Sequence, residues 1–360
     1  MHALKRFGTA FGGYKMMENY PVPECGPDDI ILEIKAAAIC GADMKHWGVD
    51  NGYDDTNITP DQQQSVRGHE FAGEIVKVGE NVKDWHIGQR VVSDNSAHVC
   101  GVCPACEQGD FLCCEHKVNL GLDNNTWGGG FSKYCKVPGE ILAIHKHAIW
   151  EIPEGIKYEE ACVLDPICNA YKAVAQQSHL IPGQDVVVFG TGPLGLFSVQ
   201  VAKLMGAVNI VMVGLDDDVK VRFGVAKELG ATHCVNGSKE DVVARCTEIC
   251  GRDNLGLVIE CSGANIALKQ AIEMTRPNAE IVRVGMGFKP LEFSINDITA
   301  WNKSIIGHMA YDSTSWRNCI RLLQSGQIKV QPMITHRLGL SQWQEGFDKM
   351  AKKEAIKVIF

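Results

Sequence analysis

A glycine-rich turn between an apolar run and a helical stretch constrains the fold of this chain more than any other feature of its sequence. The stretch reads "VVVFGTGPLG", in which Gly190, Gly192 and Gly195 follow a predicted strand with the spacing G-x-G-x-x-G. In that context Gly190 permits a tight turn, Gly192 lets the backbone approach a pyrophosphate, and Gly195 allows close packing of helix on strand. The helix then begins at Pro193 and Leu194, where backbone amides and the helix dipole favour an anion. The stretch therefore predicts a dinucleotide site; the alternative is a glycine-rich turn in a ligand-free α/β domain.

Apolar runs and helical stretches alternate after this turn. The apolar runs are "NIVMVGL", "HCVN", "GLVIECSG" and "EIVRVGMG", and stretches with helical character separate them. Such alternation is typical of a parallel sheet with helices on both faces. We therefore predict an α/β fold in which residues 156–298 form a doubly wound, dinucleotide-binding domain.

The residues before and after this domain have different patterns. Residues 1–155 contain short β-rich runs such as "IILEIKAAAI", "AGEIVKVG" and "GQRVVS", which predict an irregular β-barrel domain. Residues 299–360 are mixed: "SWRNCIRLLQSG" predicts a helix and "IKVIF" a closing strand, and we expect this segment to return to the first domain. A chain of 360 residues fits two domains at about 100–200 residues each.

The end of the second predicted strand bears on the choice of cofactor. In NAD-binding folds this strand ends in an acid that holds the ribose hydroxyls. Here it reads "NIVMVGLDDD", so Gly214 occupies the usual acidic position and Asp216 follows two residues later. Gly214 leaves room for a 2'-phosphate, whereas the aspartates would repel one. The balance favours NAD, and NADP stays open; the aspartates could also be a solvated helix start.

Composition excludes several classes of function. The formal net charge of -8 argues against a nucleic-acid partner and against a polybasic membrane patch. The chain has no apolar run of about 18 residues, and "MHALKRFGTAFGGY" lacks the apolar core of an export signal and predicts a strand. An odd count of 15 cysteines in a chain of this size fits a reducing compartment. We therefore predict a cytoplasmic protein whose cysteines are thiols or metal ligands.

One lobe of the chain concentrates cysteines. The stretch "CGVCPACEQGDFLCC", within a lobe at about residues 94–116, spaces Cys100, Cys103 and Cys106 by two residues and adds Cys114. Four thiolates can close a tetrahedron around zinc, and a closed site has a structural role. The alternative is a lobe of free thiols. Cys113 adjoins Cys114 and is the better candidate for a bystander.

A second set of metal-ligand residues is spread along the chain. It comprises Cys40 in "ICGADMKHW", His69 and Glu70 in "VRGHEFAGE", and Asp165 in "ACVLDPICNAY". Each residue alone also fits a buried thiol, a core histidine or a surface acid. Together they fit a catalytic type of zinc site, in which three protein ligands leave one position open.

These motifs resemble the zinc-dependent medium-chain dehydrogenases/reductases over nearly the full length of the chain. The resemblance rests on "ICGAD", "GHEFAGEIVKVG", the spaced cysteines, "FGTGPLG" and "ECSG". It implies a GroES-like β-barrel catalytic domain, a Rossmann domain, and an active site between them. Within the family the chain is most similar to the polyol (sorbitol-type) and threonine dehydrogenase branch, through "LDPICNA" and "MITHRLGLSQWQEGFDKM".

The resemblance also implies roles for individual residues. Cys40, His69 and Glu70 would bind a catalytic zinc, directly or through a water, and Asp165 would approach the fourth position. Aspartate is shorter than glutamate by about 1.5 Å, so Asp165 could hold a water instead of the metal. With the cysteine lobe, the resemblance therefore implies two zinc ions per chain.

The chain departs from the family pattern at the expected proton relay. Ala42 stands where the family carries Ser or Thr, and Lys45, followed by His46, stands where a relay histidine is expected. Zinc lowers the pKa of bound water from about 15.7 to about 7, roughly 12 kcal/mol, whereas a proton-transfer group contributes about 3–5 kcal/mol. Loss of one hydroxyl is therefore tolerable. We hypothesise that the proton leaves through water, Lys45, His46 or Glu70; the alternative for Lys45 and His46 is a solvated turn.

The resemblance implies reversible transfer of a hydride between a secondary alcohol and a nicotinamide cofactor. We favour a polyol or sugar derivative, because "ICGAD" and "DMKHW" differ from the usual threonine-type wording; an L-threonine-type amino alcohol is the alternative. Two other readings are a non-enzymatic zinc-binding module, which the acidic charge disfavours, and a metal-free reductase of the same fold, which the second ligand set disfavours. Expected partners are a small alcohol or ketone and further copies of the chain, as a homodimer or homotetramer.

Overall fold

The chain divides into two compact units. The computed structural model describes residues 1–7, 13–47, 64–124, 126–287 and 289–360, and of Lys45 and His46 only the backbone. The first unit comprises Met1–Asp165, Asp312–Ile320 and Ile334–Phe360; the second comprises Pro166–Tyr311 and Arg321–Met333. Most of the predicted C-terminal segment 299–360 therefore belongs to the first unit, with parts in the second.

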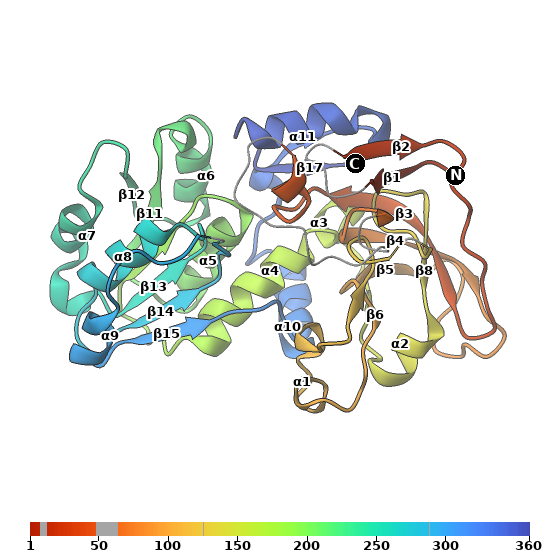
Figure 1. Ribbon diagram of the computed structural model, residues 1–360, viewed down its shortest axis with the longest axis horizontal. Coiled ribbons are helices and arrows are strands. Elements are labelled where there is room, and N and C mark those ends of the chain that lie inside the picture. The colour runs from red at the N-terminus through yellow and green to blue at the C-terminus, as the bar shows by residue number, and fades with distance from the viewer. Residues whose placement is uncertain (8–12, 48–63, 125, 288) are drawn as a thin grey trace. The chain divides into compact units, whose positions relative to one another are not determined.

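A six-stranded parallel sheet forms the centre of the second unit (Figure 1). Its strands are β10 (Val186–Phe189), β11 (Ile210–Gly214), β12 (His233–Asn236), β13 (Leu257–Glu260), β14 (Glu280–Arg283) and β15 (Ser304–Gly307). They lie in the order β12-β11-β10-β13-β14-β15, which is the strand order of the doubly wound dinucleotide-binding fold. The apolar runs predicted as strands β10 to β14 are thus confirmed as strands. The inner strands β10, β11 and β13 are buried along their whole length, whereas the edge strand β12 is buried only at Val235.

Helices join these strands. They are α5 (Pro193–Leu204), α6 (Arg222–Leu229), α7 (Val242–Cys250), α8 (Asn265–Met274) and α9 (Asn296–Ala300), with η5 (Asp216–Asp218) and η6 (Arg252–Asn254) between them. A core of Val, Ile, Leu and Met side chains lies between the sheet and helices such as α7 and α8. Before the sheet, α4 (Leu164–Tyr171) runs into a π-helix, η4 (Lys172–Gln177). A further short helix, η7 (Gln331–Met333), closes the unit's second segment.

The first unit is built on a seven-stranded sheet. Its strands are β3 (Ile30–Ala38), β4 (Glu70–Val78), β5 (Arg90–Ser93), β8 (Tyr134–Val137), β9 (Ile149–Glu151), β16 (Ile334–Arg337) and β17 (Lys357–Ile359). Neighbours run in the order β16-β17-β3-β4-β5-β9, and β8 pairs with β3. The strand predicted from "IKVIF" is confirmed as β17, which pairs antiparallel with β3 through Ile359 and Ala38. This pairing joins the end of the chain to its first long strand.

Shorter elements complete the first unit. They are β1 (Ala3–Arg6), β2 (Tyr14–Met17), η1 (Asp43–His46), β6 (Ser96–His98), α1 (Pro104–Glu107), η3 (Phe111–Cys113), β7 (Val118–Asn119), α2 (Gly139–Ile144), α3 (Tyr158–Ala161), η8 (Leu340–Gln342) and α11 (Trp343–Ala351). Helix α10 (Ser313–Gln324) begins in the first unit and ends in the second, because the boundary falls after Ile320. The antiparallel pair β6–β7 holds the base of the cysteine lobe. Aromatic side chains, among them Tyr14, Phe131, Trp343 and Phe347, pack in the core of this unit.

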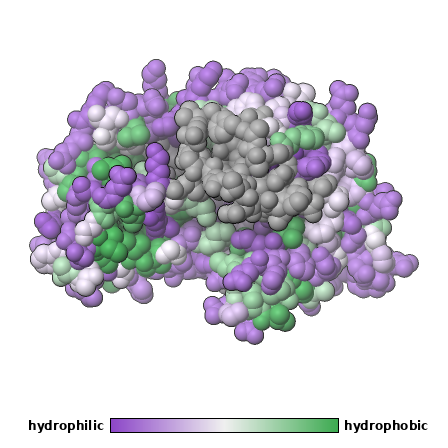
Figure 2. Space-filling model, in the orientation of Figure 1, coloured by the Kyte–Doolittle hydropathy of each residue, from purple (hydrophilic) through white to green (hydrophobic). Residues whose placement is uncertain are grey.

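Charged and polar side chains are prominent at the surface. Outside the grey atoms, hydrophilic residues predominate on the face drawn in Figure 2, with smaller hydrophobic patches between them, in line with a charged fraction of 22%. Among the described residues, no helix is long and apolar enough to cross a membrane.

Candidate active site

Three of the predicted metal ligands lie together in the first unit. One donor atom each from Cys40, His69 and Glu70 lies within 4.8 Å of the others. The pairing of β3 with β4 explains the proximity: Ala38 at the end of β3 pairs with Glu70 at the start of β4. Cys40 follows β3 by two residues and His69 immediately precedes β4. A local sheet register thus brings together residues that are about thirty positions apart.

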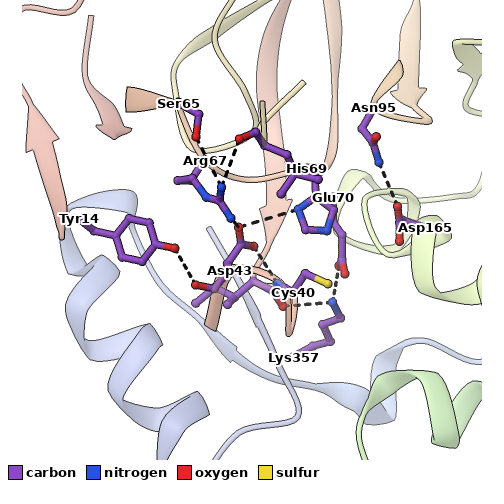
Figure 3. Close-up of polar contacts among 12 residues, drawn as sticks. Tyr14, Cys40, Asp43, Ser65, Arg67, His69, Glu70, Asn95, Asp165 and Lys357 are labelled. Atoms are coloured by element: carbon purple, nitrogen blue, oxygen red, sulfur yellow. Dashed lines mark hydrogen bonds and ion pairs between the residues drawn. The ribbon is translucent and has the colours of Figure 1, made fainter. Parts of the chain in front are cut away.

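Glu70 is held by a lysine from the far end of the chain. The Nζ of Lys357 donates to Oε2 of Glu70 and to the carbonyl oxygen of Ile39, and both charged side chains are at most 1% exposed (Figure 3). The other carboxylate oxygen, Oε1, is buried without a hydrogen-bond partner among the described residues. Burial raises the pKa of Glu70 well above its usual range, and the Lys357 ammonium opposes this shift.

Burial and neighbouring charges act together on the acidic groups of this site. Burial raises the pKa of the Cys40 thiol, Lys357 opposes that shift, and Asp165 adds to it. Glu70, Cys40 and Asp165 act in turn on Lys357: burial alone would lower its pKa, but these three acids raise it. Lys357 and, for Glu70, also His69 are the positive groups that oppose these acids. A divalent cation would balance them, and its ligands would include the buried Oε1 of Glu70, so the residues present fit a zinc ion.

A buried ion pair lies behind His69. Asp43 is fully buried; its Oδ1 lies 3.4 Å from Nη2 of Arg67 and 3.9 Å from Nδ1 of His69. Its Oδ2 accepts a hydrogen bond from the backbone N–H of Cys40, at 3.1 Å. The hydroxyl of Tyr14 donates to the Asp43 carbonyl oxygen at 2.8 Å. Asp43 therefore accepts a hydrogen bond from the backbone of one predicted ligand and lies near the ring of another, as Figure 3 shows. The Nδ1 atom of His69 has no hydrogen-bond partner among the described residues.

Asp165 lies near this group but is not part of it. The group of donors within 4.8 Å comprises Cys40, His69 and Glu70 without Asp165. Asp165 stands in the first turn of α4, and its Oδ2 accepts a hydrogen bond from Nδ2 of Asn95 at 3.2 Å. Its charge nevertheless acts on both Cys40 and Glu70. A role for Asp165 at the fourth position stays a prediction.

The expected relay region forms the short helix η1, which begins at Asp43. Ala42 precedes it with helical backbone angles, φ -65° and ψ -31°. Burial raises the pKa of Cys40, and a hydrogen bond from the backbone N–H of Ala42 opposes part of that rise. The side chains of Lys45 and His46 lie outside the described part of the structure, so their predicted role in proton transfer stays a prediction.

The four predicted lobe cysteines also converge. The sulfur atoms of Cys100, Cys103, Cys106 and Cys114 lie within 4.8 Å of one another. The backbone N–H of Cys100 donates to the sulfur of Cys114 at 3.4 Å. A hydrogen bond from the backbone N–H of Val102 is the main cause that lowers the pKa of Cys100, whereas burial raises the pKa of Cys106. Four converging sulfurs have the donor chemistry of a structural zinc site.

In the second unit, the glycine-rich turn has the geometry that its sequence predicts. Gly190 has a φ of +94°, which favours glycine. A Cβ on Gly195 would overlap the carbonyl oxygen of Gly190, whereas one on Gly192 would meet nothing within 4 Å. Gly192 is the N-cap of α5, with Pro193 and Leu194 in the first turn. The turn is therefore closely packed at Gly195 and open at Gly192, at the helix end where an anion would bind.

The end of β11 lacks an acid but has carboxylates beside it. A Cβ on Gly214 would lie 2.6 Å from the methyl carbon of Thr191 and 3.1 Å from Oδ2 of Asp218. Asp218 is buried and accepts a hydrogen bond from the backbone N–H of Leu215. Asp216 is exposed, and its Oδ1 accepts from Asn236 and Lys239. The strand β11 itself ends without an acid, and the carboxylates of Asp216 and Asp218 follow it within four residues.

Several residues around the donors were not found from the sequence. Asp43 stands within "ICGAD", three residues after Cys40, and this spacing was the available signal. Arg67 precedes His69 by two residues and also lies in a quoted motif. Lys357 is 287 residues from Glu70, and Asn95 is 70 residues from Asp165. Nothing in the local sequence links these distant pairs.

Comparisons with known families match both units. The family described as "Alcohol dehydrogenase GroES-like domain" matches residues 26–147, and the family described as "Zinc-binding dehydrogenase" matches residues 193–325. The first places a GroES-like domain within the β-rich part of the chain, and the second covers most of the parallel sheet.

Curated relatives extend over the whole chain. YdjL of Escherichia coli K12, an uncharacterised zinc-type alcohol dehydrogenase-like protein, is 78% identical over 100% of this chain and 98% of its own length. A sorbitol dehydrogenase of Halalkalibacterium halodurans is 30% identical over 100% and 98%. An L-threonine 3-dehydrogenase of Rhizobium rhizogenes is 32% identical over 95% and 94%.

Solved structures agree with this assignment. The 2R,3R-butanediol dehydrogenase of Bacillus subtilis has a TM-score of 0.83 at 29% identity, over 99% of this chain and 98% of that one. The alcohol dehydrogenase rspB of Escherichia coli CFT073, solved with NADH, has a TM-score of 0.85 at 27% identity, over 100% and 98%. The chain belongs to the zinc-dependent medium-chain dehydrogenases, and it is an oxidoreductase of the alcohol dehydrogenase type.

Proposed function

We propose that the protein catalyses the reversible oxidation of a secondary alcohol in a polyol or sugar derivative, with NAD as the hydride acceptor. The observation that carries this proposal is the convergence of Cys40, His69 and Glu70 within 4.8 Å. These residue types form a catalytic zinc site with room for a substrate oxygen. The acidic groups around Lys357 support a dication at the same place.

The residues around this site have distinct proposed roles. When bound, zinc supplies the Lewis acidity that lowers the pKa of a substrate hydroxyl. Cys40, His69 and Glu70 hold the ion; Lys357 fixes one oxygen of Glu70 and leaves the other for the metal. Asp43 orients the His69 ring from behind. The four lobe cysteines hold a second, structural zinc, so we propose two zinc ions per chain.

The second unit is proposed to bind NAD in preference to NADP. Gly190, Gly192 and Gly195 open α5 in the form that accommodates a pyrophosphate. At the end of β11, Asp218 places a carboxylate oxygen next to Gly214 and pairs with the buried Arg222, and Asp216 lies at the surface beside Lys239. We propose that these two carboxylates attract ribose hydroxyls and disfavour a 2'-phosphate. The relative rspB was solved with NADH, which is compatible with this preference.

The proposed substrate class is based on the names of similar proteins and on sequence motifs. A sorbitol dehydrogenase and a butanediol dehydrogenase both act, by their names, on secondary alcohols with a neighbouring hydroxyl. The L-threonine 3-dehydrogenase match keeps an amino alcohol as a second candidate, because its identity to this chain is similar, at 32%. We also propose a homodimer or homotetramer, which sedimentation would measure.

A substrate panel tests the proposal. Polyols, sugars, sugar derivatives and L-threonine are each incubated with NAD+ or NADP+, and absorbance of the reduced nicotinamide is followed. We expect turnover with a polyol or sugar derivative and NAD+. Turnover with L-threonine alone would establish the amino alcohol, and absence of cofactor binding would favour a non-enzymatic zinc-binding protein.

Matched cysteine variants connect turnover with the proposed metal site. Cys40→Ser should abolish activity and remove one zinc from the protein, as measured by metal analysis. Cys113→Ser is the control, because this exposed cysteine adjoins the lobe but is not one of its four converging sulfurs. A fully active Cys40→Ser enzyme would contradict the proposed mechanism.

A further inference from the structure

A chain of buried amide side chains leads from the base of the cysteine lobe to Asp165. Asn119 ends β7, and its Nδ2 donates to Oδ1 of Asn95 at 2.6 Å. Nδ2 of Asn95 donates in turn to Oδ2 of Asp165 at 3.2 Å (Figure 3). Asn95 and Asn119 are each 4% exposed and Asp165 is 9% exposed. We call Asn119, Asn95 and Asp165 the amide relay.

The backbone of Asn95 is fixed independently of the relay. Asn95 stands at the corner between β5 and β6 with a φ of +62°, a left-handed conformation that asparagine tolerates. Its N–H donates to Oγ of Ser93 at 2.9 Å, and its carbonyl oxygen accepts from the N–H of Leu120 at 2.6 Å. The side chain of Asn95 therefore starts from a well-defined position.

The orientation of the Asn95 amide follows from its partners. Nδ2 of Asn119 is a donor, so it requires the oxygen end of the Asn95 amide. The NH₂ end then faces Asp165, whose carboxylate only accepts hydrogen bonds when ionised. Asn119 thus determines which end of Asn95 meets Asp165, and it does so from the strand that closes the cysteine lobe.

Asp165 needs such a partner because its neighbours repel it. Its negative charge raises the pKa of both Cys40 and Glu70, which means that the three acids interact unfavourably when ionised. The hydrogen bond from Nδ2 of Asn95 is one contact that favours the observed position of the Asp165 carboxylate. Because the fold already fixes the Asn95 side chain, little further conformational entropy is lost when its amide donates to the Asp165 carboxylate.

We propose that Asn95 is a positioning residue, which sets the place of the Asp165 carboxylate relative to Cys40, His69 and Glu70, and that Asn119 orients Asn95 for this purpose. The inference rests on the proposed function, in which those three residues hold the catalytic zinc. It adds a hydrogen-bonded connection from Asn119, beside the cysteine lobe, through Asn95 to Asp165.

The effect is expected in the affinity of the catalytic site for metal. Replacing hydrogen-bond partners of ligating groups typically weakens metal binding by about 10–100-fold. The readouts are the zinc dissociation constant of the three-donor site, from competition with a chromophoric chelator, and the visible spectrum of Co²⁺ bound there. Neither readout requires a known substrate.

Asn95→Gly is the sharpest substitution. Glycine adopts a positive φ without strain, so the variant removes the amide but keeps the backbone corner. We expect zinc at the three-donor site to bind about 10–100-fold more weakly, with a changed Co²⁺ spectrum, while the lobe retains its zinc.

Asn119→Asp tests the orientation step without changing Asn95 or Asp165. The introduced carboxylate accepts hydrogen bonds only, so the Asn95 amide must rotate and present its oxygen to Asp165. We expect weaker zinc binding at the three-donor site, in the same direction as for Asn95→Gly.

Asn209→Ala is the matched control. Nδ2 of Asn209 donates to Oδ2 of Asp185 at 3.1 Å, so the variant removes an equivalent amide–carboxylate bond in the second unit. We expect both zinc affinities to stay at the parent values.

The outcomes separate this inference from the proposed function. A parent protein that binds zinc at the three donors, with Asn95→Gly unchanged in affinity and Co²⁺ spectrum, would overturn the inference alone. Equal loss of zinc from the lobe and from the three donors in Asn95→Gly would also overturn it, because that result indicates general disruption. A parent protein that binds no zinc at the three donors would overturn the proposed function.

Discussion

At the scale of single residues, we expect substitutions in the buried pair of Glu70 and Lys357 to destabilise the protein strongly. Removing one member of a buried ion pair leaves a charge without compensation, which typically costs about 3–5 kcal/mol. We therefore expect Lys357→Met to lower the free energy of unfolding of the metal-free protein by about that amount, measured by urea denaturation.

A double variant provides the control for this prediction. Glu70→Gln combined with Lys357→Met removes both charges, so much of the lost stability should return. A Lys357→Met protein as stable as the parent would show that the Glu70 carboxylate does not depend on its lysine.

Ala42 carries the second prediction at this scale. A positioned proton-transfer group typically accelerates a reaction by about 10²–10⁴-fold. Because we infer that the proton already has another path, we expect Ala42→Ser to raise kcat by less than about 10²-fold. The pH–rate profile of kcat should also keep its shape. A rise in kcat of about 10²–10⁴-fold would show that the parent chain lacks an efficient path for the proton. An unchanged kcat would show that the missing hydroxyl has no cost.

The residues of the site differ in how far the sequence could predict them. Cys40, His69 and Glu70 belong to short motifs, and one local strand pairing brings them together. The lobe cysteines are evenly spaced, so their convergence was predictable as well. Lys357 and Asn95 act across long sequence separations, and their residue types have no spacing that would mark them. Their roles depend on tertiary packing alone.

At the scale of elements, two glycines in the turn between β10 and α5 have different roles: Gly195 is needed for packing, and Gly192 is proposed to make room for the cofactor. A Cβ on Gly195 would overlap backbone, and such overpacking costs about 1–3 kcal/mol or more. Gly192 has open space around it and lies where the pyrophosphate would approach. We expect Gly195→Ala to lower the thermal stability clearly. Gly192→Ala should instead weaken NAD+ binding, measured by fluorescence titration, with little loss of stability.

The comparison of these two variants is itself the control. Equal loss of stability in both would show that the turn has no specialised position for a ligand. Unchanged NAD+ affinity in a folded Gly192→Ala protein would argue against pyrophosphate binding at this turn.

The π-helix η4 is linked to the end of β15 through a histidine. Nδ1 of His308 lies 2.6 Å from Oε1 of Gln177, and Nε2 lies 3.3 Å from Oδ1 of Asn169. Burial, with a contribution from Lys172, lowers the pKa of His308 to about 4. His308 is therefore neutral in the folded protein at pH 6, whereas in the unfolded chain its pKa is about 6.5.

This difference predicts a pH dependence of stability. Between about pH 6.5 and pH 4 the unfolded chain binds more protons at this position, so His308 destabilises the fold increasingly as the pH falls through that window. The full effect is at most about 3 kcal/mol. We expect His308→Gln to lose less stability than the parent between pH 7 and pH 4.5, measured by urea denaturation at each pH. Parallel pH profiles would contradict the shift.

Strands and helices of the second unit were more predictable than those of the first. Strands β10, β11 and β13 are buried along their whole length and are nearly continuous apolar runs in the sequence. The first unit contains short elements such as β6 and β7, which are too brief for a periodic pattern. The π-helix η4 differs from an α-helix only in its hydrogen bonding, for which "KAVAQQ" gives no signal.

At the scale of the whole molecule, each unit carries its own proposed ligand site. The proposed metal sites lie in the first unit and the proposed dinucleotide turn in the second. A ligand stabilises the part that binds it, by about 2.7 kcal/mol at a concentration of 100 times Kd. We expect calorimetry to show two components: a chelator should lower the one from the first unit, and NAD+ should raise the other.

The identity of each component is checked with variants already described. The transition that responds to chelator should be the one that Lys357→Met lowers, and the transition that responds to NAD+ should be the one that Gly195→Ala lowers. A single transition that responds equally to both ligands would mean that the units unfold together.

The interrupted course of the first unit has a consequence for protein synthesis. The second unit takes most of its residues from one continuous stretch, 166–311, whereas the first unit requires residues 334–360. Lys357 is translated 287 residues after Glu70, which at about 5–20 residues per second is a delay of roughly 15–60 seconds. On the ribosome, the second unit can therefore mature first, once residues 321–333 have been made. The proposed acidic ligands emerge long before Lys357, so we expect the nascent chain to spend that interval with the Glu70 carboxylate lacking its lysine.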